Sequence, residues 1–226
     1  MPKNMRSLSI EPYIVWRTPD IYVLNKPPGW PTTGRTLADE DCIQFHLMRH
    51  HGGMVWALHQ LDADTSGVNL FTTQKKWVQP IKVLWSHPET CKDYFAIVHG
   101  TPNWVTREVD QPIGKNELGV LGVHVYGQTA RTAFEVLDQN NGFSLLHARL
   151  FTGRTHQIRL HLAHLGHPLV GEAWYRPQPC TLHPRQALHA HRLRLPENPL
   201  LPQNEFVAPV PADLQGLATQ LGLRYP

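Results

Sequence analysis

Short apolar runs separated by turn residues recur along most of the chain. Runs of four to eight β-prone residues bounded by Gly, Pro, Asn or Asp are typical of strands. Such runs predict strands at residues 13–16, 21–24, 55–58, 68–72, 91–98, 118–125, 130–137, 143–150 and 187–195. An Asn-Asn-Gly turn signal separates the runs 130–137 and 143–150, so we expect these two to form an antiparallel hairpin.

Four other segments carry apolar residues at the spacing of a helix. They span residues 37–48, 74–85, 155–166 and 212–221. Acids at positions 39–41 suit the N-terminus of the first helix, and Thr155 and Gly166 are the expected N-cap and C-cap of the third. The pattern is weakest over residues 100–128. Residues 174–184 and 196–211 are rich in proline and predict irregular chain.

This mixture of strands and separate helices predicts an α+β fold. We expect a mixed, largely antiparallel sheet that is bent into two lobes, with peripheral helices and a central cleft. The 226 residues suffice for one large domain or two small lobes. With 41% apolar and 17% charged residues, the composition is that of a globular chain rather than a disordered one.

Two acidic residues lie in a polar connection between two of the expected strands. The connection reads His59-Gln60-Leu61-Asp62-Ala63-Asp64-Thr65-Ser66-Gly67, and apolar runs precede and follow it. A loop between rigid strands is a common place for a functional side chain. Two alternatives stay open at this level. Asp62 or Asp64 caps the backbone of an ordinary turn, or the two carboxylates form an acid/base pair like that of a glycosidase.

Cations are unevenly distributed, although the net charge is only +3. Residues 149–194 contain seven Arg, seven His and a single acid, Glu172, and no lysine follows Lys115. A stretch in which Arg is the only strong cation suits bidentate contacts with phosphate or carboxylate groups. The alternative is a solvated surface with an incidental excess of one sign.

The histidines around residue 160 raise the question of a metal site. His161 and His164 are one helical turn apart, which is compatible with a zinc pair. His156 is out of register with them, and the chain has no H-E-x-x-H motif. We therefore expect no metal and interpret these residues as ordinary helix histidines or as RNA contacts.

Cysteine usage and the apolar runs indicate the compartment. Cys42, Cys91 and Cys180 are far apart and form no C-x-x-C pair, which argues against a disulfide framework and fits a reducing compartment. No apolar stretch approaches the roughly 20 residues of a membrane span. The N-terminus lacks the apolar core of a signal peptide. We expect a cytoplasmic protein that does not contact a membrane.

Four blocks of the sequence carry a family resemblance. Residues 23–30 contain a Lys-Pro-Pro-Gly loop, and residues 59–67 are similar to H-R-L-D-x-x-T-S-G. Residues 92–100 are similar to K-x-Y-x-A-x-V-x-G, and residues 152–161 match T-G-R-T-H-Q-I-R-x-H. In kind and order these blocks resemble the RluA-type pseudouridine synthases, which convert specific uridines of ribosomal or transfer RNA to pseudouridine. The matches are spread from about residue 21 to residue 211.

The resemblance implies an isomerase in which Asp62 is the catalytic carboxylate. By the same resemblance, Tyr94 packs on the target base, and Arg159 points from the start of its helix to Asp62 across a catalytic cleft. Substrate-binding roles are implied for seven further residues: Lys26, His59, Gln60, Arg154, His156, Gln157 and Ile158.

The resemblance also implies the partners and the domain organisation. We expect a stem-loop of ribosomal or transfer RNA as the partner, no DNA, no cofactor, and a monomer. One catalytic domain is expected over residues 1–226, with a core of about residues 13–211. The family's optional N-terminal RNA-binding domain is expected to be absent, because only about twenty residues precede the first block.

The chain departs from the family pattern at two places. Gln60 replaces the signature Arg, which in relatives is thought to contact the RNA where the flipped base has left the stack. Because Gln is uncharged and shorter, a phosphate contact there is weakened. The usual Leu-Gly-Asp after the arginine helix is Val170-Gly171-Glu172. Neither change alters the Asp62 carboxylate.

The chemistry of the residues fits this activity. Isomerisation of uridine breaks the glycosidic C–N bond and rejoins the base through carbon, so it needs no redox change, metal or energy source. It needs an ionised carboxylate, an Arg that keeps it charged and an aromatic platform for the detached base. Two rival functions use the same residues. One is an inactive RNA-binding or assembly protein of the same fold, suggested by Gln60. The other is a nucleoside hydrolase, against which the arginine-rich stretch argues.

Overall fold

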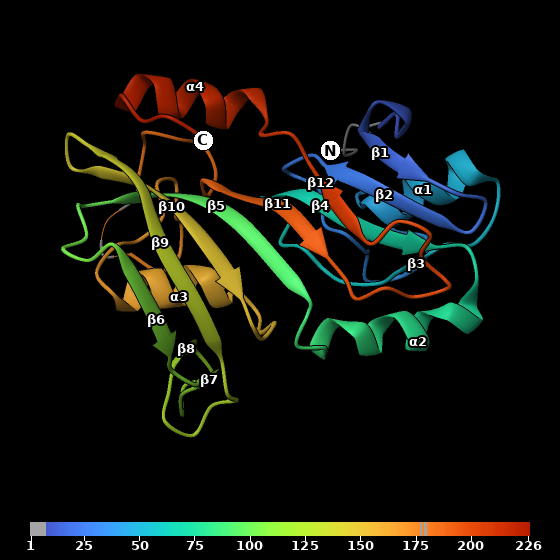
Figure 1. Ribbon diagram of the computed structural model, residues 1–226, viewed down its shortest axis with the longest axis horizontal. Helices are drawn as coiled ribbons and strands as arrows, with labels where there is room; N and C mark the ends of the chain where they lie inside the picture. The colour runs from blue at the N-terminus through green and yellow to red at the C-terminus, as the bar shows by residue number, and fades with distance from the viewer. Residues whose placement is uncertain (1–7, 177, 179) are drawn as a thin grey trace. The chain divides into compact units, whose positions relative to one another are not determined.

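The chain divides into two compact units, each with its own core. The computed structural model describes residues 8–176, 178 and 180–226 (Figure 1). The first unit comprises the described part of Met1–Thr90 together with Ala190–Pro209, and the second comprises Cys91–His189 and Val210–Pro226. Strand β11 (Leu188–Arg194) begins in the second unit and ends in the first.

The first unit is built on strands in the order β1-β2-β4-β11, in which β2 pairs antiparallel with both β1 and β4. In addition, β3 pairs with β4 and β12 pairs with β11. Its elements are 3-10 turns at Glu11–Tyr13, Lys75–Trp77 and Leu84–Ser86, strands β1 (Ile14–Arg17), β2 (Ile21–Lys26), β3 (Trp56–Ala57), β4 (Ser66–Thr72) and β12 (Glu205–Val207), and helices α1 (Ile43–His51) and α2 (Val78–Val83).

The central strands of the first unit are covered on both faces. Successive side chains of β2 point to opposite sides, so that Val23 packs in a cluster with Ile81 of α2, whereas Leu24 packs with Leu47 of α1. Every residue of β4 is buried as a result. A strand covered on both faces has a nearly continuous apolar run, which is why the sequence pattern identified it.

The second unit repeats this arrangement with other elements. Its antiparallel strands follow the order β5-β10-β9-β6, and a separate pair is formed by β7 and β8. The elements are β5 (Cys91–His99), β6 (Thr106–Asp110), β7 (Ile113–Lys115), β8 (Leu121–Val123), β9 (Arg131–Asn140), β10 (Phe143–Leu150), α3 (Gln157–His164) and α4 (Ala212–Leu221).

Helices α3 and α4 cover opposite faces of the sheet in the second unit (Figure 1). Along β5, Ala96 and Val98 pack in one cluster with Leu162 of α3, whereas Ile97 packs in another with Leu217 of α4. Burial of a Val, Leu or Ile side chain contributes roughly 1.5–3 kcal/mol relative to its exposure. The antiparallel sheets and separate helices confirm the predicted α+β fold.

The predicted hairpin is confirmed, and its loop explains the Asn-Gly sequence. Strands β9 and β10 are connected by Asn141 and Gly142, whose φ values are 48° and 80°. A two-residue hairpin loop with positive φ at both positions matches the twist of the flanking strands, and Asn-Gly is the sequence that best tolerates it.

Two predicted helices differ from those observed. The first begins at Ile43 rather than near residue 37, because the Asp39 carboxylate accepts the backbone N–H groups of Arg35 and Thr36 and holds that segment in a turn. The third has His156 rather than Thr155 at its N-cap, in a left-handed conformation, and Leu165 rather than Gly166 at its C-cap. The segment 74–85 is a short α-helix between two 3-10 turns.

Several short strands carry no clear sequence signal. In β6, Val109 alone is buried, and the other side chains are charged or polar and exposed, as suits the edge of a sheet. Strand β12 lies in a segment whose prolines predicted irregular chain, and the strand predicted over residues 118–125 is only three residues long.

The predicted loop 174–184 contains Pro177 and Pro179, which lie outside the described residues. In the described part of the chain, no helix is long and apolar enough to span a bilayer.

Gly67 allows β4 to approach β11 closely, and this contact can be tested. Its φ is +118°, and a Cβ atom there would overlap the backbone of Ala190. Gly67→Ala should lower the free energy of unfolding by roughly 2 kcal/mol or more, because both the strained φ and the overlap with backbone oppose the folded state. Urea unfolding followed by circular dichroism measures this change.

Gly216→Ala is the matched control. Gly216 is exposed within α4, and an added Cβ has open space around it. Alanine there should raise the free energy of unfolding by about 0.5–1 kcal/mol. A loss of stability in Gly216→Ala as large as in Gly67→Ala would contradict the role given to the close approach at Gly67.

Candidate functional site

Asp62 opens a tight turn directly before β4. The N–H of Thr65 donates to the carbonyl of Asp62 at 3.0 Å, which closes a four-residue turn over Ala63 and Asp64. The Asp62 side chain is half-buried and that of Asp64 is exposed. Both acids therefore lie in the connection between β3 and β4, as the sequence predicted.

Lys26, the last residue of β2, holds this turn through hydrogen bonds from its buried side chain. Its side chain is fully buried, and its Nζ donates to the carbonyl oxygens of Pro27 at 3.0 Å, of Trp30 at 2.8 Å and of Ala63 at 2.8 Å. An ammonium group has three N–H donors and no acceptor, so it suits a site lined by carbonyl oxygens. Because Ala63 follows Asp62 directly, Lys26 positions the backbone that carries the carboxylate.

The loop after Lys26 makes two further contacts with the same carbonyl. The backbone N–H groups of Gly29 and Trp30 donate to the oxygen of Ala63 at 2.9 and 3.2 Å. The Lys-Pro-Pro-Gly sequence is therefore a clamp on the Asp62 turn. Since Lys26 has no exposed surface, we propose that it positions this turn, and the substrate-binding role that the sequence predicted stays a prediction.

His59 and Gln60 precede Asp62 and differ in their surroundings. The Nε2 atom of His59 accepts the backbone N–H of Leu70 at 3.2 Å, and its ring packs on Trp85, so His59 ties the connection to β4. Gln60 is exposed, and its Oε1 accepts a hydrogen bond from Thr33 at 3.2 Å. Gln60 is thus placed where it can contact a ligand from solvent.

Tyr94 lies on β5 in the second unit. It is half-buried, and its register partner on β10 is Ala148. Its side chain packs against the core cluster that contains Ile158 and Leu188. Helix α3 therefore supports the strand that presents Tyr94. Ile158 itself is buried in this cluster, and its substrate-binding role stays a prediction.

Arg159 is a buried cation on α3 with a buried carboxylate partner. It is 3% exposed, and its Nε and Nη2 atoms donate to the two oxygens of Glu172 at 2.9 and 2.7 Å. Such a bidentate pair fixes both the position and the plane of the guanidinium group. Burial alone raises the pKa of Glu172, but the hydrogen bonds from Arg159 and from the Trp174 N–H outweigh it, so the pKa is lowered.

Aromatic side chains surround Arg159. Its Cζ lies 4.9 Å from the ring centroid of Trp174 and 5.1 Å from that of Tyr175, distances typical of cation–π contacts. His156 hydrogen-bonds to the Tyr175 hydroxyl through Nδ1 at 2.6 Å. The sequence singled out His156 and Arg159, and it noted Glu172 only as a departure. Trp174 and Tyr175 were missed, because they begin a segment that is otherwise rich in proline.

Gln157 and Arg154 explain the Thr-Gly-Arg-Thr-His-Gln sequence. The Oε1 of Gln157 accepts the Thr152 hydroxyl at 2.8 Å and the Arg154 N–H at 3.0 Å. Its Nε2 donates to the Arg131 carbonyl at 3.0 Å. Gln157 is buried and thus organises the loop before α3, whereas Arg154 is exposed and can reach a ligand.

The predicted residues fall into two groups, one in each unit. Lys26, His59, Gln60 and Asp62 lie in the first unit. Those of the second unit are Tyr94, Arg154, His156, Gln157, Ile158 and Arg159. The interaction of Arg159 with Asp62 joins the two groups and stays a prediction.

The arginine-rich stretch 149–194 is less basic in the structure than in the sequence. Four of its seven arginines have carboxylate partners, and three of these carboxylates belong to residues outside the stretch. The pairs are Arg149 with Asp93, Arg159 with Glu172, Arg185 with Asp213 and Arg192 with Glu205. Arg154 and Arg194 are exposed. Phosphate contacts from this stretch therefore depend on a few exposed arginines rather than on a broad basic face.

His161 serves the core of the second unit. It is fully buried, its Nδ1 pairs with the Thr132 hydroxyl at 2.9 Å and its Nε2 with the Gln111 carbonyl at 3.0 Å. Both ring nitrogens are therefore engaged, and burial lowers the pKa of His161. Among the residues that the structure describes, no group of three or more His, Cys, Asp or Glu side chains is arranged to hold a metal ion.

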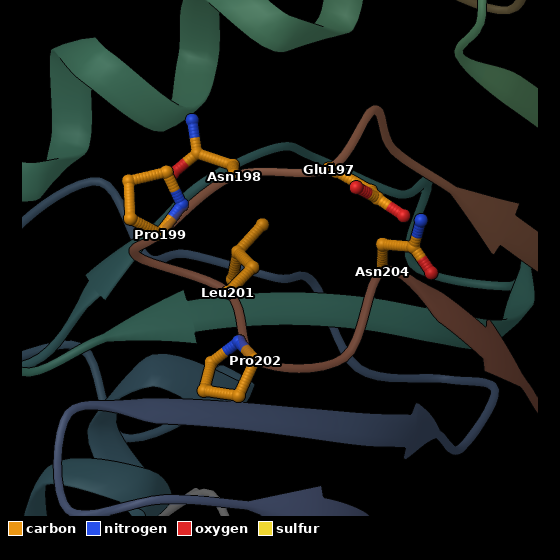
Figure 2. Close-up of a pocket in the computed structure, with 6 residues that line it drawn as sticks. All are labelled: Glu197, Asn198, Pro199, Leu201, Pro202 and Asn204. Atoms are coloured by element: carbon orange, nitrogen blue, oxygen red, sulfur yellow. The ribbon is translucent and has the colours of Figure 1, made fainter.

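A hollow of about 430 Å³ lies in the first unit, in the chain between β11 and β12 (Figure 2). It is lined by Glu197, Asn198, Pro199, Leu201, Pro202 and Asn204. None of the predicted site residues is among them, and Glu197 is their one ionisable side chain. This lining offers an anionic RNA no cation, so the hollow does not change the choice of candidate residues.

Comparison with known proteins adds evidence that is independent of this geometry. A sequence profile described as RNA pseudouridylate synthase matches residues 20–164. An "Uncharacterized RNA pseudouridine synthase" of Chloroflexus aurantiacus is 41% identical over 167 residues, which are 73% of this chain and 52% of that protein. The chain thus spans about half the length of this relative.

A second relative and a solved structure cover more of the chain. "Ribosomal large subunit pseudouridine synthase D" of Haemophilus influenzae is 31% identical over 238 residues, covering 94% of this chain and 71% of that protein. The structure "Human RNA Pseudouridylate Synthase Domain Containing 4" has a TM-score of 0.77 and 24% identity, with 96% of this chain and 95% of that chain covered. The likeness to this human structure shows a shared fold.

The Arg159–Glu172 pair yields a prediction about stability and pH. Glu172→Gln removes the counter-charge of a buried cation, which should lower the free energy of unfolding at pH 7 by on the order of 3 kcal/mol. Because the pKa of Glu172 is lowered in the folded state, the carboxylate stabilises the protein above its unfolded pKa of about 4.3. That stabilisation is lost as the pH falls through the lower folded pKa.

Urea unfolding of wild type and variant between neutral and acidic pH tests this prediction. The difference in stability should be full at pH 7 and should shrink well below pH 4. Glu108→Gln is the matched control, since Glu108 forms a similar fork with Arg131 but both side chains are about half exposed. Its effect should be far smaller. A loss in Glu172→Gln that stays constant with pH would contradict the account.

Proposed function

Because this chain belongs to the RNA pseudouridylate synthase family, we propose that it isomerises specific uridines of a structured RNA to pseudouridine. The observation that carries the proposal is the match over residues 20–164, which includes Asp62, Tyr94 and Arg159. Relatives named as ribosomal large subunit synthases support ribosomal RNA as a substrate, and transfer RNA is the alternative.

Asp62 is the proposed catalytic residue. Isomerisation breaks the bond between C1′ of the ribose and N1 of uracil, turns the base, and forms a bond between C1′ and C5. The C5 proton is lost to solvent, and N1 takes up a proton, so the product has the composition of the substrate. The Asp62 carboxylate either adds to C1′ or removes a ribose proton next to it, and both routes need its ionised form.

The turn around Asp62 supports this role. A reacting carboxylate must stay in place while the base detaches, and misplacement by about 1 Å costs on the order of a hundredfold in rate. The clamp from Lys26, Gly29 and Trp30 on Ala63 restricts the backbone next to Asp62. The half-buried side chain remains within reach of a nucleotide from solvent.

Tyr94 and Arg159 complete the proposed reaction centre. Tyr94 stacks on the detached uracil and keeps it from escaping while it turns. Arg159 supplies positive charge to the Asp62 carboxylate, and the fork with Glu172 holds the guanidinium in a fixed plane. The proposal requires that Asp62 of the first unit and Tyr94 and Arg159 of the second act on the same nucleotide.

Binding of the RNA requires that the target nucleotide leave the stack, which costs a few kcal/mol. Exposed Arg154 is a candidate phosphate contact that offsets part of this cost. Gln60, His59 and His156 are proposed to contact the nucleotide or its neighbours. We further propose one catalytic domain over residues 1–226 that acts as a cytoplasmic monomer. The cytoplasmic location is in line with three cysteines that form no disulfide.

A second candidate function, RNA binding without catalysis, is favoured by one observation. Gln60 stands where the family signature has Arg, which weakens an RNA contact and suggests an RNA-binding or assembly protein without activity. The retained Asp62, Tyr94 and Arg159 favour the enzyme. A nucleoside hydrolase would use the same carboxylate but release free uracil.

Tritium release from RNA labelled at C5 of uridine distinguishes these functions. Transcripts of ribosomal and transfer RNA incubated with the protein should release tritium to water without free uracil. Asp62→Asn should abolish this release, by at least about a thousandfold, and retain RNA binding, because its amide can neither add to C1′ nor take up a proton.

Asp64→Asn is the matched control. Asp64 lies in the same turn two residues later and is exposed, so its variant should keep most of the activity. Equal loss in both variants would mean that the two carboxylates act as a unit. Release of free uracil would indicate hydrolysis, and binding without either product would indicate an inactive RNA-binding protein.

A further inference from the structure

We infer that Trp174 stacks on a nucleobase next to the target uridine and thereby contributes to the recognition of the RNA. The inference rests on the proposed function, because it depends on RNA as the ligand of the site around Arg159. No motif of the sequence singled out Trp174.

The exposure of Trp174 sets it apart from the other tryptophans. The residue is 67% exposed, whereas the other six tryptophans of the chain are buried or half-buried. An indole ring is costly to leave in water, since its burial is among the largest apolar contributions that one side chain can make. A tryptophan that stays exposed beside the proposed reaction centre is therefore a candidate for contact with a ligand.

The ring is held in place although it is exposed. The backbone N–H of Trp174 donates to Oε1 of Glu172 at 3.0 Å, the same oxygen that accepts Nη2 of Arg159 at 2.7 Å. One buried carboxylate thus fixes both the cation and the backbone of the tryptophan. Ring contacts to His156 and Tyr175, with centroids 5.2 and 6.4 Å away, restrict the indole further.

The geometry leaves room for one stacking partner. The Arg159 guanidinium lies 4.9 Å from the centroid of the indole and covers one face of the ring. A ring that is covered in this way and still two-thirds exposed has surface available for another flat group. Because the ring is already ordered, stacking costs little side-chain entropy.

An RNA base is the flat group that this site suits. Every base has an aromatic face, and stacking on an aromatic side chain tolerates any base. Because Trp174 and Arg159 share the Glu172 carboxylate, a base on Trp174 lies close to the cation that serves the reacting nucleotide. Tyr94 is assigned to the uracil that turns, so Trp174 receives a neighbouring base.

The test uses an oligouridylate with a single 2-aminopurine at its centre, whose fluorescence is quenched by stacking. At saturation, wild type should quench the probe. Trp174→Ala should bind it roughly 5- to 150-fold more weakly and should lose that quenching. Trp174→Phe keeps a ring and should retain an intermediate part of both signals, which a merely structural role would not produce.

Two further variants serve as controls. Tyr126 is also an exposed aromatic residue of the second unit, at 91% exposure, and Tyr126→Ala should bind and quench as wild type does. Asp62→Asn should also quench normally, because stacking does not need the carboxylate. Thermal unfolding of each variant establishes that it is folded under the conditions of the assay.

The outcomes separate this inference from the proposed function. Quenching that survives Trp174→Ala, equal losses in Trp174→Ala and Tyr126→Ala, or no binding of the probe by wild type would overturn the stacking role. Quenching that depends on Trp174 supports it even if tritium release fails, in which case only the proposed function is wrong. Tritium release with no effect of Trp174→Ala on quenching leaves the proposed function intact and rejects this inference.

Discussion

The buried ammonium group of Lys26 is the contact on which the candidate site of the first unit depends. A charge with no exposed surface is destabilising unless its donors are satisfied, and here three carbonyls accept hydrogen bonds from the ammonium group. Two of those carbonyls belong to the loop after β2 and one to Ala63, next to Asp62. The energetic requirement to satisfy the charge therefore fixes the loop after β2 together with the turn at Ala63, which is 37 residues from Lys26 in sequence.

In the second unit, a buried charge again fixes its neighbours through hydrogen bonds, but here the charge is negative. Glu172 is 1% exposed, and it is stabilised by Arg159 and by the backbone of Trp174. In each unit, a buried charged side chain thus positions a group that is exposed or half-buried: Lys26 acts on the Asp62 turn, and Glu172 on Trp174. The buried pair of Arg159 and Glu172 is weak evidence for stability, because burying the charges offsets much of their attraction. What the buried charged groups contribute here is a fixed geometry, for Asp62 in the first unit and for Arg159 and Trp174 in the second.

How much the sequence predicted depends on how local each signal is. Strands β4 and β5 and the Asn141-Gly142 turn follow from alternation, burial and positive φ, which a single sequence carries. Edge strand β6 was missed because one buried side chain gives no pattern. In the site, motifs identified Asp62, Tyr94 and Arg159. The burial of Lys26 and the contacts that hold Trp174 beside Arg159 were not predictable, because both depend on contacts between segments that are distant along the chain.

We propose that Lys26 acts by holding the Asp62 turn and does not touch the RNA. Lys26→Met keeps most of the side-chain volume and removes all three donors. The most direct test is the rate of pseudouridine formation at saturating RNA, measured with the RNA dissociation constant at a temperature where circular dichroism shows a folded variant. We expect the rate to fall by on the order of a hundredfold, through misplacement of the carboxylate, and the dissociation constant to stay unchanged. A weaker RNA affinity with an unchanged rate at saturation would contradict the claim.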